Sequence, residues 1–118
     1  MARQATIYHN PACGTSRNVL AALREGGIEP KIVEYLKTPP DRATLERLLK
    51  AMGKSVRDIL RKRGTPYEEL GLGDPGVSDD RIFAAIAAHP ILIERPIVVI
   101  EDRAALCRPA ETVQALMA

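Results

Sequence analysis

The chain has 118 residues, 46% of them hydrophobic, and a formal net charge of +2. This length predicts one domain whose core is large enough to fold without disulfides or a structural metal. The small charge gives no indication of a nucleic-acid or membrane partner. Two cysteines, no secretory signal and no long apolar segment predict a cytoplasmic protein with free thiols.

The N-terminal part predicts a strand, a loop and a helix. Residues 5–8 are rich in β-branched and aromatic side chains, which favour a strand. Residues 16–25 place Val19, Leu20 and Leu23 on one helical face before two glycines end the helix. The intervening loop therefore places Cys13 at or just before a helix N-terminus.

That position favours a reactive thiol at Cys13. The first N–H groups of a helix have no helical partner, and the helix dipole is positive at this end. Both effects stabilise a thiolate and an anion bound beside it. The alternative is a cysteine that only fills a turn near the surface.

The remaining strands lie at both ends of the sequence. Residues 31–36 predict a second strand, parallel to the first because a helix connects them. Residues 97–100 and 104–107 predict two antiparallel strands around a turn at residues 101–103. Arg108-Pro109 is then expected to open a last helix.

The middle of the chain, residues 39–89, predicts several short helices inserted into this domain. Asp41, Ser55 and Ser78 are suited to cap the N-termini of three of them. Thr65-Pro66-Tyr67-Glu68 has the same pattern and predicts a fourth.

This order of elements predicts an α/β fold, a thioredoxin/glutaredoxin-like mixed sheet with an inserted helical subdomain. The core is expected over about residues 5–36 and 91–118. Pro96 stands just before the third predicted strand, where this fold has a cis-proline. Most X-Pro bonds are trans, but the topology favours cis here.

The residues around Cys13 exclude two kinds of thiol chemistry. The spacing is Cys-x-x-Ser, so no second thiol lies nearby to resolve a mixed disulfide. Position 19 is Val19, which excludes the phosphatase loop with its arginine six places after the cysteine. Arginines that bind an anion would have to come from elsewhere, and Arg61, Arg95 and Arg108 are candidates. Each alone is also compatible with a solvated surface charge.

Five segments together resemble the ArsC family, the glutaredoxin-coupled arsenate reductases of bacteria. They are residues 9–18 (HNPACGTSRN), 67–72 (YEELGL), 89–93 (HPILI), 95–99 (RPIVV) and 106–109 (LCRP). The resemblance extends from Ile7 to Leu116. Many relatives have a longer C-terminal tail.

The resemblance implies a mechanism and a set of site residues. Cys13 would be the nucleophile that forms a thiol-arsenate adduct, and glutathione and glutaredoxin would resolve it without a bound cofactor or metal. His9 would help to keep the thiol ionised. The residues implied to bind the substrate are Arg61, Arg95, Arg108, Gly14, Thr15 and Ser16.

Alternative roles are open for three polar or sulfur-containing residues, namely His9, Ser16 and Cys107. His9 is either a cation that lowers the pKa of Cys13 or a histidine hydrogen-bonded within the loop. Ser16 either donates to the sulfur or caps the helix, and the cap is favoured. Cys107 lies in a predicted strand and is expected to be a small buried residue, not a redox partner.

Two other functions fit parts of the sequence. Cys13-Gly14-Thr15-Ser16 is similar to the Cys-Gly-Phe-Ser motif of monothiol glutaredoxins, which carry iron–sulfur clusters. An Spx-type regulator that binds RNA polymerase has an ArsC-like fold, but commonly has a second cysteine where Ser16 stands.

Overall fold

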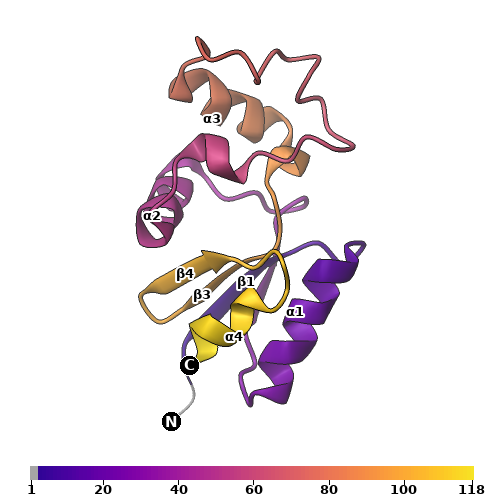
Figure 1. Cartoon of the computed structure of the whole chain (residues 1–118), viewed down its shortest axis with the longest axis vertical. Helices are drawn as coiled ribbons and strands as arrows, with labels where there is room; N and C mark the ends of the chain where they lie inside the picture. Colours follow the sequence, from indigo (N-terminus) through magenta and orange to yellow (C-terminus); the bar gives the residue numbers. More distant parts are fainter. Residues whose placement is uncertain (1–2) are drawn as a thin grey trace. The chain divides into compact units, whose positions relative to one another are not determined.

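The computed structural model describes residues 3–118, which divide into two compact units. One unit takes in residues 3–38 and 95–118, and the other takes in residues 39–94 (Figure 1). The boundary of the second unit lies beyond the predicted end of the insertion at residue 89. Main-chain hydrogen bonds explain this difference, because Arg61 N donates to Leu92 O at 2.7 Å and Glu94 N donates to Ile59 O at 2.7 Å. The grouping of both units into one domain stays a prediction.

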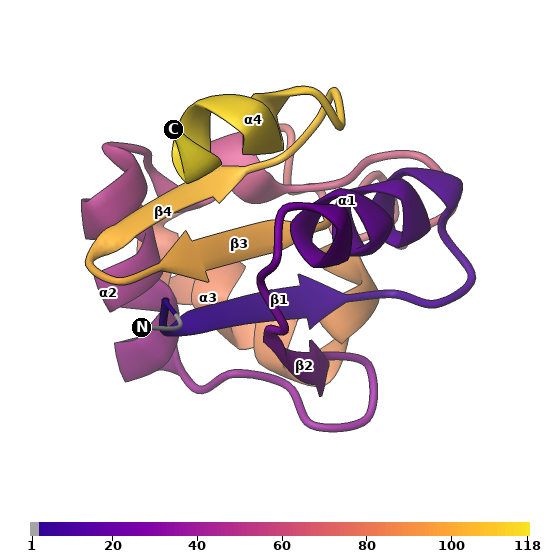
Figure 2. The same cartoon turned by 90° about the horizontal axis from the view of Figure 1, so that it is seen from below.

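The first unit is built on a four-stranded mixed sheet with the strand order β2-β1-β3-β4 (Figure 2). β1 is parallel to β2 and antiparallel to β3, which is antiparallel to β4. This confirms the predicted α/β mixed sheet. The elements of the unit are β1 (Ala5–His9), α1 (Gly14–Glu25), β2 (Lys31–Glu34), β3 (Ile97–Ile100), β4 (Arg103–Leu106) and α4 (Thr112–Met117).

The register of the sheet brings three chain segments to one end. Tyr8 pairs with Ile97, and Ile97 pairs with Leu106 on its other side. The end of β1, the start of β3 and the end of β4 are therefore neighbours. The loops that follow or precede these strands carry Cys13, Arg95 and Arg108.

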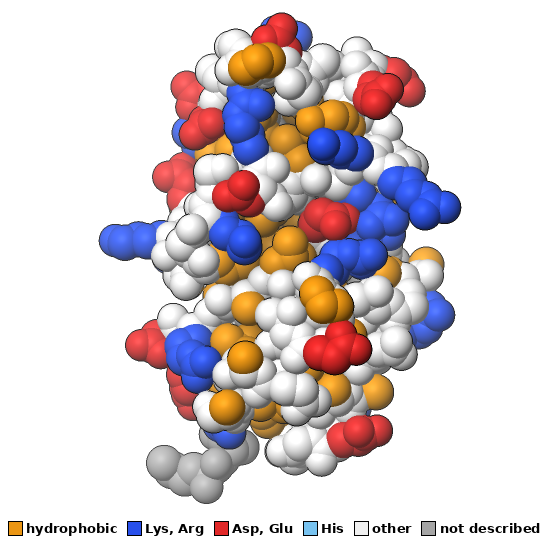
Figure 3. Space-filling view, in the orientation of Figure 1, with side chains coloured by type: hydrophobic (Ala, Val, Ile, Leu, Met, Phe, Trp, Pro, Cys, Tyr) orange, Lys and Arg blue, Asp and Glu red, His pale blue; other side chains and the backbone are white. Residues whose placement is uncertain are grey.

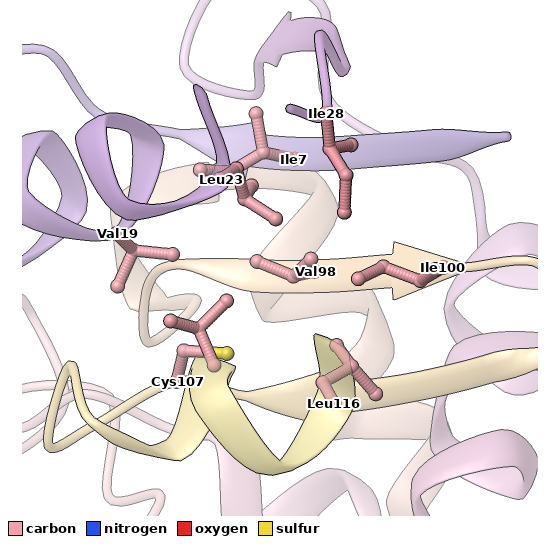
Figure 4. Close-up of a cluster of buried hydrophobic side chains, with 9 residues drawn as sticks. Ile7, Val19, Leu23, Ile28, Val98, Ile100, Cys107 and Leu116 are labelled. Atoms are coloured by element: carbon pink, nitrogen blue, oxygen red, sulfur yellow. The ribbon is translucent and has the colours of Figure 1, made fainter. Parts of the chain in front are cut away.

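A buried apolar cluster joins α1 and α4 to one face of this sheet (Figure 4). Val19 and Leu23 from α1 are fully buried, as are Ile7 of β1 and Val98 of β3. Fully burying such a side chain contributes about 1.5–3 kcal/mol to folding. The cluster therefore fixes α1, and with it the position of Cys13, against the sheet. Its members are Ile7, Val19, Leu23, Ile28, Val98, Ile100, Cys107, Val113 and Leu116.

The second unit consists of two α-helices and two short 3-10 helices. They are α2 (Arg42–Met52), η1 (Val56–Ile59), α3 (Asp79–Ala88) and η2 (Pro90–Leu92). The predicted caps are confirmed: Asp41 accepts from Thr44 N at 2.8 Å, and Ser78 accepts from Arg81 N at 3.2 Å. Ser55 forms its capping box with Asp58.

The helix predicted to begin at Thr65-Pro66 is wrong, because this segment forms turns. The Thr65 hydroxyl donates to Arg61 O at 2.7 Å and accepts from Tyr67 N at 3.3 Å, but no helix follows it. Further along, the Arg57 guanidinium donates to the carbonyls of Leu72 and Val77. These side-chain contacts hold residues 65–77 in an irregular path.

Two predicted boundaries at the ends of the first unit also need correction. Strand β2 ends at Glu34, not at residue 36, because Lys37 N donates to Glu34 O and turns the chain. Arg108-Pro109 does not open the last helix. Thr112 N donates to Pro109 O in a turn, and α4 begins only at Thr112.

The buried cluster predicts a difference between two leucines of the first unit. Leu23→Ala should lower the free energy of unfolding by about 2–5 kcal/mol, because it leaves a cavity in the core. Leu36 is 42% exposed, so Leu36→Ala should change it by no more than about 0.5 kcal/mol. Urea unfolding measures both values. Equal losses in the two variants would contradict this account of the core.

Candidate active site

Cys13 stands at the N-cap of α1, where the sequence predicts it. Its backbone is extended, with φ −95° and ψ 122°, and its carbonyl accepts the first helical hydrogen bond from Arg17 N at 3.0 Å. Its own N–H donates to Asn10 O at 3.0 Å, which closes the turn after β1. Gly14, Thr15 and Ser16 form the first turn of α1, so their N–H groups lie at the positive end of the helix.

The surroundings of Cys13 favour the thiolate. Burial is the largest single influence and raises the pKa, but the Ser16 N–H and the Arg95 and Arg108 guanidiniums outweigh it. Together they lower the pKa of Cys13 to about 7. The Cys13 side chain makes no capping hydrogen bond to the first turn of α1. The Ser16 N–H therefore acts on the sulfur mainly through the orientation of its dipole. A free cysteine is mostly protonated at neutral pH, so the lowered pKa gives Cys13 a larger share of thiolate.

Arg95 and Arg108 lie beside the sulfur. Arg108 Nη1 is 3.6 Å from Cys13 Sγ and donates to Arg95 O at 3.1 Å, so one guanidinium contacts both residues. Nε and Nη1 of Arg95 are buried and have no hydrogen-bond partner among the described residues. Buried donors are almost always paired. Donors of this kind next to a thiolate suit the oxygens of an anion.

The prolines after both arginines have cis peptide bonds. The Arg95–Pro96 bond is cis, as the topology favours, and so is the Arg108–Pro109 bond, which the sequence gives no reason to expect. Cys107 N donates to Pro96 O at 2.9 Å and joins the two segments.

The preference for Ser16 as a helix cap is wrong, because Cys13 occupies the N-cap and Ser16 is the third residue of α1. The Ser16 side chain is fully buried. Its Oγ lies 2.7 Å from His9 Nδ1 and accepts from Asn10 N at 3.1 Å. Neither of these two contacts is to the sulfur, so among the described residues the backbone N–H is the part of Ser16 that acts on Cys13.

The surroundings of His9 favour its neutral form. Burial, the largest influence, lowers the pKa of His9. Glu34 opposes the shift, and Arg17 and Arg24 add to it. This shift favours the neutral ring at pH 7, and a role of His9 in keeping the thiol ionised stays a prediction. Its contact with Ser16 makes it part of the support of the loop.

Arg61 lies in the other unit and has partners there. Its Nη1 pairs with Glu94 Oε1 at 2.9 Å, and its Nε donates to Arg63 O at 3.1 Å. Arg61 is therefore not a solvated surface charge. Its contribution to an anion site at Cys13 stays a prediction.

The second cysteine has the opposite environment. Cys107 is fully buried within the apolar cluster, and burial raises the pKa of its thiol to about 12. This agrees with the expectation of a small core residue. The thiol is protonated at neutral pH, so the two cysteines differ sharply in reactivity.

Two residues of the loop had no role in the sequence-based prediction. Asn10 Oδ1 accepts from Ala12 N at 3.0 Å, and Arg17 Nη1 donates to Pro11 O at 2.8 Å. An asparagine often marks a turn in a sequence, because its side chain can accept from the N–H two residues later and close an Asx-turn. No comparable signal identifies Arg17.

Residues 3–118 contain no group of three or more histidine, cysteine or acidic side chains that is placed to hold a metal ion. No helix there has the length and apolar character to cross a membrane. On the face drawn in Figure 3, basic and acidic side chains are interspersed.

The fold and the site define a thioredoxin-like protein with one low-pKa cysteine at a helix N-terminus and two arginines beside it. The model of the ArsC family matches residues 8–116, and the chain belongs to the ArsC family.

Three proteins illustrate the relationship. An arsenate reductase of Rhizobium meliloti (strain 1021) is 59% identical over 108 residues, which are 92% of this chain and 77% of the relative. An uncharacterised protein of Escherichia coli (strain K12), YfgD, is 46% identical over 96% of both chains. The solved structure of an arsenate reductase from Vibrio cholerae has a TM-score of 0.92 and 46% identity, and covers 98% of both chains.

The positive groups around Cys13 predict its titration. In a Cys107→Ser background, the rate of alkylation by iodoacetamide should rise with pH around a midpoint near 7, the value to which the pKa of Cys13 is lowered. Arg95→Met removes one charge and should move the midpoint up by about one unit, toward the ~8.5 of a free cysteine. Arg47→Met, at an exposed position of α2, is the control. An unchanged midpoint in Arg95→Met would contradict the assignment.

Proposed function

We propose that this protein is an oxidoreductase that reduces arsenate to arsenite through a covalent adduct on Cys13. The observation that carries the proposal is a thiol of pKa about 7 beside two arginines, one of which has buried N–H donors with no hydrogen-bond partner among residues 3–118. Arsenate has the charge and the tetrahedral oxygens that such donors bind. The names of the Rhizobium and Vibrio relatives support the same substrate.

In the first step the Cys13 sulfur attacks arsenic. An S–As bond forms, one As–O bond breaks, and the oxygen leaves as water after protonation. Arg95 and Arg108 hold the remaining oxygens and stabilise their charge. The N–H groups of Gly14, Thr15 and Ser16 add the positive end of α1, and Arg61 is the third arginine of the proposed site.

The later steps need two further thiols. Glutathione, the co-substrate, bonds to arsenic and displaces a second oxygen as water. A glutaredoxin thiolate then attacks the glutathione sulfur, and the electron pair of the S–As bond passes to arsenic. Arsenic goes from As(V) to As(III), and the two sulfurs leave as a mixed disulfide. Water releases arsenite and restores Cys13.

The need for these two thiols determines which cellular compartment suits the proposed reaction. Cys107 is buried and protonated, so it is unsuited to resolve the adduct. A resolving thiol borrowed from glutathione requires a reducing compartment. We therefore place the protein in the cytoplasm, with arsenate, glutathione and glutaredoxin as its partners and no bound cofactor.

The two cysteines should respond differently to the same substitution. Cys13→Ser keeps the shape of the side chain but removes the ionisable nucleophile, so arsenate reduction should fall to the background rate. Cys107→Ser should retain most of the activity. The assay follows NADPH oxidation with arsenate, glutathione, glutaredoxin and glutathione reductase. Equal activity of the two variants would refute the proposal.

The arginines should lose function on conversion to lysine, which keeps the charge but not the planar fork. Arg95→Lys and Arg108→Lys should each lower kcat/KM for arsenate by about tenfold or more, equivalent to about 1.4 kcal/mol. Arg61→Lys should have a milder effect.

Arg47→Lys on the exposed face of α2 is the matched control and should keep full activity. A loss confined to Arg47→Lys, or none in Arg95→Lys and Arg108→Lys, would show that the two arginines do not bind the substrate.

A further inference from the structure

Three buried polar residues of the described part of the chain lie in one place. They are His9, Asn10 and Ser16, each no more than 6% exposed. A hydrogen-bonded contact joins Ser16 Oγ to His9 Nδ1, and a second joins it to Asn10 N. Buried polar groups cost free energy unless they are fully bonded. Their concentration in the loop before Cys13 indicates that the loop has to keep one conformation.

Asn10 makes three of the hydrogen bonds that define this conformation. Its N–H donates to Ser16 Oγ at 3.1 Å, and its carbonyl accepts from Cys13 N at 3.0 Å. Its side-chain Oδ1 accepts from Ala12 N at 3.0 Å. The first two bonds use the backbone and would survive substitution. The third depends on the asparagine side chain alone.

The side-chain bond acts on the residue immediately before Cys13. It fixes the Pro11–Ala12 peptide, while the Asn10 carbonyl fixes the next peptide through the Cys13 N–H, and together the two bonds limit how the chain before Cys13 can rotate. The extended backbone of Cys13 then sets its sulfur against the Ser16 amide and 3.6 Å from Arg108 Nη1. The stabilisation of the thiolate by the Ser16 N–H and the Arg108 guanidinium depends on their distance and orientation. It weakens when the sulfur moves by a fraction of the contact distance.

We propose that Asn10 is a positioning residue: its side chain closes the turn that holds the Cys13 sulfur against the Ser16 amide and the Arg108 guanidinium. Its importance for turnover rests on the proposed arsenate reduction, whereas its effect on the thiol does not. Asn10 acts through the loop and makes no hydrogen bond to the sulfur among the contacts of the described residues.

The test compares three variants in the full chain with a Cys107→Ser background, where Cys13 is the remaining thiol. Asn10→Ala removes the acceptor, and Asn10→Ser offers a hydroxyl that closes the same kind of turn more weakly. Asn18→Ala is the matched control, because Asn18 is exposed on α1. Each variant is alkylated with iodoacetamide from pH 5 to 10 and assayed for arsenate reduction over the same range.

Asn10→Ala should raise the midpoint of alkylation by about one pH unit, which lowers the thiolate fraction at pH 7 about fivefold. Its arsenate reduction should fall at pH 7 and recover toward pH 9, where the thiolate is restored. Asn10→Ser should lie between Asn10→Ala and the parent. Asn18→Ala should match the parent.

A purely structural role for Asn10 would lower stability without moving the midpoint, and would reduce activity by the same factor at every pH. That result in Asn10→Ala, or in Asn10→Ser if Asn10→Ala does not fold, would overturn the inference. The two proposals can also fail separately. If Asn10→Ala shifts the midpoint but the parent protein reduces no arsenate, the positioning role is supported and the proposed function is refuted.

Discussion

A half-buried thiolate needs positive groups around it, and this requirement organises one end of the sheet. Burial alone would keep the Cys13 thiol protonated, but the Ser16 amide, Arg95 and Arg108 reverse the sign of the shift. The groups come from the first turn of α1, the segment just before β3 and the segment just after β4. The pairing of Tyr8 with Ile97 and of Ile97 with Leu106 makes these positions neighbours. The site therefore depends on the strand register.

The apolar cluster beneath the sheet keeps this arrangement in place. α1 is fixed by Val19 and Leu23, so the dipole at its N-terminus has a constant direction. The same cluster contains Cys107, whose thiol pKa is raised by burial without an opposing charge from residues 3–118. The pKa is lowered to about 7 at Cys13 and raised to about 12 at Cys107, because the first thiol faces N–H donors and the second is surrounded by apolar side chains.

The sequence was sufficient for the mixed sheet, the position of Cys13 and the caps at Asp41, Ser55 and Ser78, because local patterns determine them. It was insufficient for features that depend on tertiary contacts. The helix expected at Thr65 is replaced by turns that the Arg57 side chain holds from elsewhere in the chain. The protonation of His9 depends on burial, which a single sequence does not reveal. Convergence of Arg95 and Arg108 followed from topology, whereas a contribution by Arg61 stays a prediction.

A crystal structure of the protein soaked with arsenate tests the central claim most directly. The account predicts an ordered anion beside Cys13 Sγ, with its oxygens within hydrogen-bonding reach of Arg108 and of the buried Nε and Nη1 of Arg95. An arsenate bound at another place, with the Arg95 and Arg108 guanidiniums turned away from Cys13, would contradict it.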